Sequence, residues 1–181
     1  SYALTLLVTD NVSISAIESV IGTGSTDVVT LTAATRLSES GVASVIGSSG
    51  TDVINMLNTG ALAVSAVETV LGSSAAGDAV TLLAAGTVST SQVESVVGTT
   101  ATTDVLRLLS TGSVAVSVID TVIGSTGLDI LTVTDSGTTG ALAISAIESV
   151  IGTTATGETV TLLTSSSLSM SGFETVIGSA A

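Results

Sequence analysis

The chain has 181 residues, no proline, cysteine or histidine, and only two basic residues, Arg36 and Arg107, against fifteen acids. A formal net charge of −13 argues against a nucleic-acid partner, whose phosphates attract Lys and Arg, and against an anionic membrane surface. The mean hydropathy is high, +0.81, yet no apolar run is long enough for a spanning helix, so we expect no membrane insertion.

A three-residue motif recurs along the whole chain: valine, then a second branched or leucine residue, then glycine. Its glycines are 25 to 28 residues apart, a period that is typical of stacked repeats. A serine stands seven residues before each glycine and a valine two residues before it. The seven glycines are Gly22, Gly47, Gly72, Gly98, Gly124, Gly152 and Gly178.

In chain order, each glycine is followed by a short turn of small residues, an acid, and a second apolar run. The first such run is Asp27-Val-Val-Thr-Leu31, in which the second and fourth residues after the acid are large and apolar. This alternation and the many β-branched residues predict two or three short strands per copy. Residues 135–140 interrupt the fifth copy and are interpreted as a longer turn. A helix over residues 15–21 is the less favoured alternative, because helix formers are scarce.

These patterns predict an all-β protein, a parallel β-solenoid of about seven coils with a 25–28-residue period. Residues 1–181 would form a single repeat domain, uncapped at both ends. Equivalent strands of successive copies would pair, so the valines would fill the interior and the serines could form a hydroxyl ladder. The absence of proline agrees, because every inner strand needs its backbone N–H groups.

The two ends complement each other. The chain stops where an acid-led strand should follow, and it begins with a segment, 1–7, that resembles this strand. The chain is either a segment of a longer repetitive protein or a subunit that stacks head to tail as a homopolymer. The predicted assembly interface consists of Ser1, Tyr2, Leu4, Leu6, Phe173, Val176, Ile177 and Gly178.

Twelve of the acids fall into two columns. If equivalent residues stack, like charges in a column would lie about 4.8 Å apart and would need cations, raised pKa values or screening by solvent. Calcium, a hard cation that takes carboxylate and carbonyl oxygens, is the candidate cofactor of the column that follows the glycines, although solvated acids at the strand edge, without an ion, are the favoured interpretation. This column is Asp27, Asp52, Asp78, Asp104, Asp129 and Glu158, and the other is Glu18, Glu68, Glu94, Asp120, Glu148 and Glu174.

Two turns, 47–52 and 124–129, read G-x-x-G-x-D. They resemble the glycine-rich turn G-G-x-G-x-D of the repeats-in-toxin calcium-binding proteins, which bacteria secrete. The resemblance implies side-chain calcium ligands at Asp52 and Asp129 and carbonyl ligands from the glycine-rich turns. More broadly, the acidic repeats resemble those of bacterial adhesins, surface-layer proteins and extracellular fibre subunits.

No enzyme is expected, because serines without histidine or lysine lack an evident base and regular repetition leaves no singular site. The predicted function is structural: a secreted subunit or segment of an extracellular filament, matrix fibre or surface layer, outside the cell or on its surface. The alternative is a calcium-stiffened stalk or binding module of a large adhesin.

Overall fold

The protein is all-β and forms a parallel β-solenoid, as the sequence predicts. The computed structural model describes residues 2–24, 26–101, 103–135, 141–164 and 167–179, and every helix or strand assigned in these ranges is a strand. Within the same ranges, no helix is long and apolar enough to cross a membrane. The structure divides into two compact units, which are described separately, and the prediction of a single domain stays a prediction.

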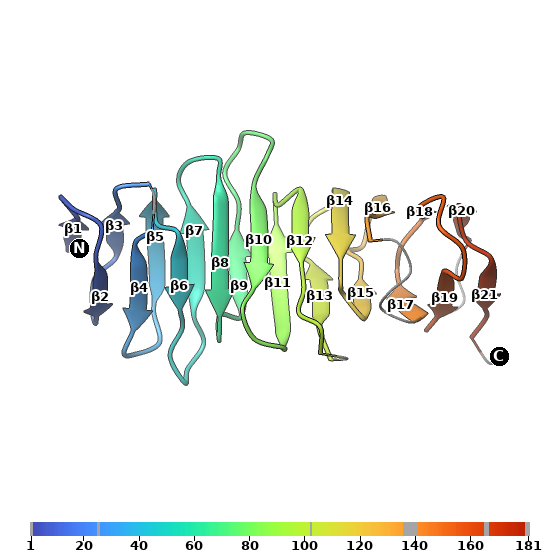
Figure 1. Ribbon diagram of the computed structural model, residues 1–181, viewed down its shortest axis with the longest axis horizontal. Helices are drawn as coiled ribbons and strands as arrows, with labels where there is room; N and C mark the ends of the chain where they lie inside the picture. Colours follow the sequence, from blue (N-terminus) through green and yellow to red (C-terminus); the bar gives the residue numbers. More distant parts are fainter. Residues whose placement is uncertain (1, 25, 102, 136–140, 165–166, 180–181) are drawn as a thin grey trace. The chain divides into compact units, whose positions relative to one another are not determined.

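The first unit comprises residues 1–84 and 90–93. Its strands alternate along the chain between two parallel sheets, in the orders β1-β3-β5-β7-β9 and β2-β4-β6-β8-β10 (Figure 1). Each coil therefore contains one strand of each sheet. The strands are β1 (Ala3–Thr5), β2 (Asn11–Ile14), β3 (Ser19–Ile21), β4 (Val28–Leu31), β5 (Arg36–Ser40), β6 (Ser44–Ile46), β7 (Val53–Met56), β8 (Ala61–Ser65), β9 (Thr69–Leu71) and β10 (Ala79–Leu82).

The second unit comprises residues 85–89 and 94–181, so that β11 (Thr87–Ser91) is divided between the units. It repeats the same plan, with strand orders β12-β14-β16-β18-β20 and β13-β15-β17-β19-β21. Its strands are β12 (Ser95–Val97), β13 (Val105–Leu108), β14 (Gly112–Ser117), β15 (Thr121–Ile123), β16 (Asp129–Val133), β17 (Ala141–Ser145), β18 (Ser149–Ile151), β19 (Thr159–Leu162), β20 (Ser169–Ser171) and β21 (Thr175–Ile177).

The coil is shorter than the sequence repeat, which corrects the prediction of about seven coils with a 25–28-residue period. Paired residues in neighbouring coils lie 16 to 22 positions apart, from Ala3 with Ser19 to Thr121 with Ala143. Each copy of the repeat supplies three strands and each coil uses two, so one repeat makes one and a half coils. The 21 described strands therefore amount to about ten coils.

Equivalent residues of successive copies consequently fall on opposite sheets. The predicted hydroxyl ladder is wrong, because the column serines pair with the residue that precedes a glycine and not with one another. Ser40 pairs with Ile21, Ser65 with Ile46 and Ser145 with Ile123. The pairing still places apolar side chains of both strands inside, since the inward positions keep a period of two.

The valine column fills the interior, as predicted, in six of its seven copies. Val20, Val45, Val70, Val96, Val122 and Val150 have no exposed surface. The large residues after each acid also point inward, as Val29 and Leu31 do in β4. The core of each unit is thus a narrow stack of aliphatic side chains between two sheets.

The glycines of the repeat phrase are required by close backbone contact between coils. A Cβ added at Gly47 would lie under 3.0 Å from the carbonyl oxygen of Ala66 in the next coil, and the same holds for Gly72 and Gln92. The contacted residue adopts a left-handed conformation, with φ of 51° at Ala66 and 56° at Gln92. Left-handed backbone turns the chain sharply between two strands, and its carbonyl then projects toward the coil before.

Candidate functional site

The acids that follow the glycines cap the turns between strands. Asp52 is fully buried, and its Oδ1 accepts a hydrogen bond from the Thr35 N–H at 2.8 Å. Its Oδ2 accepts bonds from the Ser48 N–H at 2.6 Å and the Ser48 hydroxyl at 2.9 Å. One carboxylate therefore binds its own turn to the coil before it.

The same arrangement recurs through the column that was predicted to bind calcium. The residue after the glycine donates its N–H to the acid in every described copy, and it is always Ser or Thr. The donor and acceptor pairs are Thr23 and Asp27, Ser48 and Asp52, Ser73 and Asp78, Thr99 and Asp104, Ser125 and Asp129, and Thr153 and Glu158. The sequence reasoning missed this hydroxyl column, although Ser or Thr one residue after each glycine is visible in the repeat.

The second acidic column binds backbone from the opposite direction. The Glu68 carboxylate accepts a hydrogen bond from the Asp52 N–H at 2.7 Å, one coil earlier, and Glu148 accepts one from the Asp129 N–H at 2.8 Å. Tyr2 occupies the place of the turn acid in the first copy and donates its N–H to Glu18. Ala43 is the one member of this column without a carboxylate.

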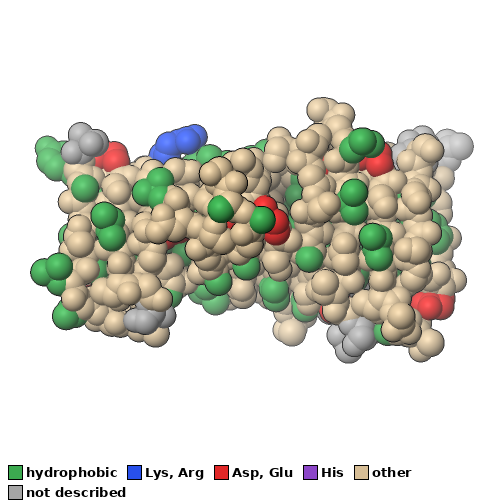
Figure 2. Space-filling view, turned by 90° about the horizontal axis from the view of Figure 1, so that it is seen from above, with side chains coloured by type: hydrophobic (Ala, Val, Ile, Leu, Met, Phe, Trp, Pro, Cys, Tyr) green, Lys and Arg blue, Asp and Glu red, His purple; other side chains and the backbone are tan. Residues whose placement is uncertain are grey.

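Equivalent residues of successive copies lie on opposite sheets, so the buried acids of one column do not stack directly on one another. This corrects the expected spacing of about 4.8 Å between them. Asp27 precedes β4 and Asp78 precedes β10, three strands further along the same sheet, so about 14 Å separates their levels. This distance exceeds the Debye length of about 8 Å at physiological ionic strength. Few acidic side chains are visible on the face drawn in Figure 2, because the acids of the turn column are at most 5 % exposed.

Hydrogen bonding determines the titration of Asp27. The Thr23 N–H lowers the pKa of this carboxyl, with further lowering from the Thr23 hydroxyl and the Asp10 N–H, while burial acts in the opposite direction. Donated N–H groups stabilise the ionised form of a carboxyl group. Asp27 is therefore a charged cap at neutral pH.

Calcium binding by the turn column stays a prediction. Among the described residues, no three acidic, histidine or cysteine side chains come together in a group that could hold a metal ion. The side-chain oxygens of Asp52 and Asp129, the ligands that the resemblance implies, accept N–H and hydroxyl hydrogen bonds. An ion at either residue would have to replace these donors or share the oxygens with them.

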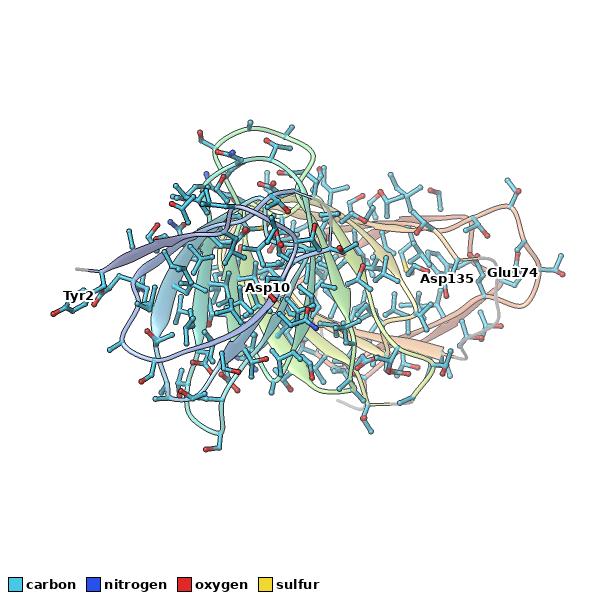
Figure 3. All side chains as sticks on the ribbon, turned by 60° about the vertical axis from the view of Figure 1, so that its left-hand side comes forward. Tyr2, Asp10, Asp135 and Glu174 are labelled. Atoms are coloured by element: carbon cyan, nitrogen blue, oxygen red, sulfur yellow. The ribbon has the colours of Figure 1, made fainter. Side chains whose placement is uncertain are left out.

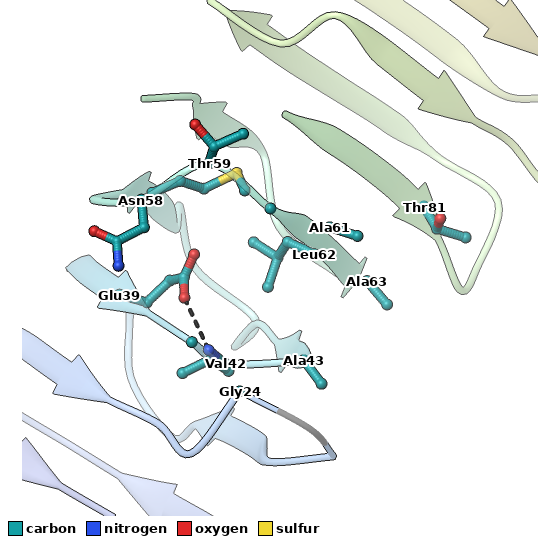
Figure 4. Close-up of a pocket in the computed structure, with 13 residues that line it drawn as sticks. Gly24, Glu39, Val42, Ala43, Asn58, Thr59, Ala61, Leu62, Ala63 and Thr81 are labelled. Carbon is teal, nitrogen blue, oxygen red and sulfur yellow. Dashed lines mark hydrogen bonds between the residues drawn. The ribbon is translucent and has the colours of Figure 1, made fainter. Parts of the chain in front are cut away.

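Glu39 is a buried carboxylate that the sequence reasoning did not single out. It lies on β5 with its side chain inward, is 3 % exposed, and accepts a hydrogen bond from the Val42 N–H at 3.2 Å. Burial raises the pKa of Glu39 to about 7, and the charge of Asp78 adds to the rise while the Val42 N–H opposes it. Glu39 lines a hollow of about 570 Å³ in the first unit (Figure 4).

The residues of the predicted assembly interface lie in the first and last coils. Tyr2 is 70 % exposed and projects away from the strands, and Leu4 and Leu6 are half-buried (Figure 3). In the last coil Phe173 is half-buried and Gly178 exposed, while Val176 and Ile177 are 46 % and 49 % exposed. Ser1 lies outside the described residues. Whether these residues form an interface stays a prediction.

Comparisons with models of protein families, with curated proteins and with solved structures found no match for this chain. The suspected resemblance to secreted acidic repeat proteins therefore stays an expectation from the turn sequences. Function has to be argued from the geometry of the turns, the end coils and the hollow.

Proposed function

We propose that the protein has a structural role, in which solenoid coils of one copy continue into those of the next to build an extracellular filament or matrix fibre. One observation carries the proposal. A Cβ added at Gly178 would meet no atom of the described residues within 4 Å, whereas at the six equivalent glycines it would lie under 3.0 Å from a backbone atom of the following coil. Gly178 thus presents half of a coil-to-coil contact.

The first copy of the repeat offers the other half. Each contacted residue is left-handed and stands six residues before the next column glycine, and Ala16, with φ of 55°, is the first of this column. A second copy that places its Ala16 carbonyl opposite Gly178 would repeat the contact between Gly47 and Ala66. In this arrangement the incoming β2 extends the sheet that ends in β21.

The edge strands favour such continuation. Val176 is 46 % exposed in the last coil, whereas the six equivalent valines are fully buried. Parallel strands at a sheet edge present unpaired N–H and C=O groups that accept another strand. Because the added strand repeats the sequence pattern of its neighbour, it would bury Val176 and pair the edge at the same time.

The Gly178→Ala variant tests the proposal, because it adds a methyl group at a position with free space around it in the isolated chain. The added methyl should leave the isolated chain unchanged, because nothing lies within 4 Å, but it should block the contact between copies. Gly86→Ala is the matched control, since a Cβ there is equally free and no junction contact is proposed for it. We expect filaments of the wild type and of Gly86→Ala by negative-stain microscopy, and dispersed chains for Gly178→Ala.

Sedimentation velocity at rising protein concentration supplies the solution measurement. Growth of the wild type with concentration, lost in Gly178→Ala at an unchanged melting temperature, is the expected outcome. A wild type that remains a single small species at every concentration would contradict the proposal, and so would a Gly178→Ala variant that assembles normally.

A further inference from the structure

The second copy of the repeat departs from most of the other copies at three alternate positions. Glu39 stands where the other copies have Ile14, Val64, Thr90, Val116, Ile144 and Met170. Two residues on is Gly41, a position occupied by Ala, Gln or Val in most copies, and Ala43 replaces the acid of the second column. Within five residues, the three departures introduce one carboxylate, remove the side chain at Gly41 and shorten the side chain at Ala43.

All three residues line the same hollow of about 570 Å³. The volume is within the range of small-molecule sites, roughly 300–1,000 Å³. Gly41 and Ala43 are smaller than most of their equivalents, and they line the hollow beside the one acid that replaces a core position. Other lining residues are Gly24, Val42, Met56, Asn58, Thr59, Gly60, Ala61, Leu62, Ala63 and Thr81.

The hollow combines one charge with walls of mixed polarity, in which Thr59 and Thr81 lie beside apolar residues. Glu39 reaches from β5 into the space that the other residues line (Figure 4). Met56 and Leu62 are buried aliphatic side chains, and Asn58 adds a polar group at the exposed side. A buried carboxylate costs free energy unless a cation or hydrogen bonds compensate it, and the structure shows one hydrogen bond, from Val42.

We propose that this hollow binds a small organic ammonium ion, with the Glu39 carboxylate as the counter-ion and an alkyl chain against Met56 and Leu62. A metal ion fits less well, since no group of three candidate ligands occurs in the described part of the chain. A formal net charge of −13 favours the approach of cations. This site is independent of the proposed assembly of copies.

The charge pairing gives the site a pH dependence. The strands on either side of β5, β3 and β7, carry no titratable side chain, and Asp78 is the carboxylate whose charge acts on Glu39. A bound cation favours the ionised form of Glu39, so binding should release a proton near neutral pH. The ammonium ion should bind at least about tenfold more weakly at pH 5 than at pH 8, because the Glu39 carboxyl is mostly protonated at pH 5.

The two methionines provide a direct assay. Met56 lines the hollow and Met170 lies in β20 of the other unit, so methyl-labelled methionine gives one reporter and one internal control. The labelled full chain is titrated with n-butylammonium chloride at pH 8 and pH 5. We expect a saturable shift of the Met56 methyl resonance, with no shift of the Met170 resonance beyond that produced by sodium chloride.

Glu39→Gln keeps the shape of the side chain and removes the charge. It should weaken n-butylammonium binding at pH 8 about tenfold or more and abolish the difference between pH 8 and pH 5. The neutral probe n-butanol should shift the Met56 resonance far less than the ammonium ion. An unmoved Met56 resonance, equal binding by Glu39→Gln, or equal binding of n-butanol would each overturn the proposal.

Discussion

At the scale of single residues, two kinds of position depart from a plain alternating pattern, and each has a different physical cause. The column glycines lack a side chain because the carbonyl oxygen of a left-handed residue occupies the space where a Cβ would be. Glu39, in contrast, is a charged residue in a column that is aliphatic in most copies. Backbone packing requires the column glycines, whereas the buried carboxyl group of Glu39 weakens the core.

Glu39 should make the stability of the protein depend on pH. Its folded-state pKa is raised to about 7 from an ordinary value of 4.5. Because the folded-state pKa is raised, the contribution of protonated Glu39 to the free energy of unfolding is fully present below pH 4.5. This contribution is lost as the pH rises through about 7. Ionisation of the buried group should therefore destabilise the wild type in mildly alkaline solution.

Glu39→Gln removes this titration. The variant should be more stable than the wild type by about 2–3 kcal/mol at pH 9, with a much smaller difference at pH 4. Urea denaturation of both proteins at the two pH values measures the effect. An equal difference in unfolding free energy at pH 4 and pH 9 would show that Glu39 is not the titrating group.

At the scale of the element, the turn is stabilised by a carboxylate and not by glycine and serine alone. Asp52 accepts bonds from Thr35 in the coil before and from the N–H and hydroxyl of Ser48 in its own turn. Glu68 accepts the Asp52 N–H from the following side. Two acids of different columns thus connect three successive coils by hydrogen bonds to backbone N–H groups.

Asp52→Ala should cost about 2–4 kcal/mol of unfolding free energy, because it leaves part-buried N–H donors of two successive coils without their charged acceptor. Thermal and urea unfolding measure the loss, and Ser49→Ala, at an exposed residue of the same turn, is the surface control. The same loss is expected with and without a chelator, because the cap itself needs no ion. A wild type that a chelator destabilises to the level of Asp52→Ala would instead favour calcium at this turn.

The sequence pattern correctly predicted that the chain forms strands and which of their residues point inward. It did not predict which strands pair with one another. The alternation after Asp27 identifies Val29 and Leu31 as inward residues, and both are buried. It does not identify the neighbouring strand, because all three strands of a copy have the same inward period and are compatible with one another. Ser40 therefore pairs with Ile21 while keeping an apolar interior, and the coil closes after two strands instead of three.

The candidate sites differ in how far the sequence could reveal them. The capping acids were found as a column, but their role depends on donors such as Thr35, which belong to another copy of the repeat. Glu39 could have been found by comparing copies at each inward position, since a single carboxylate there is a plain outlier. The hollow itself could not, because it also depends on side chains of β7 and β8 that only the fold places opposite Glu39.

At the scale of the whole molecule, the proposed filament requires that the coils of one copy continue into those of the next in the same strand register. Ser19 pairs with Ser38 and Ile21 with Ser40 where the last strand of one copy meets the middle strand of the next. The same rule at the open edge of β21 would place Thr175 opposite Ser13 and Ile177 opposite Ser15 of a second copy. This register is specific enough to be tested by a covalent link.

The chain contains no cysteine, so an introduced pair reports on the junction without background. Paired residues of adjacent strands lie within the Cα separation that a disulfide spans, about 4.4–6.8 Å. Asn11, four residues before Ser15 along the same edge, is about 13 Å away from it and serves as the off-register control.

The most direct measurement is oxidative cross-linking of the double variant Ser15→Cys, Ile177→Cys, followed by denaturing electrophoresis without reductant. If coils continue from one copy to the next, this variant should give a ladder of covalent multimers, and the variant Asn11→Cys, Ile177→Cys should give far fewer. Single covalent chains only, or equal ladders from both double variants, would contradict continuation of the coils from one copy to the next.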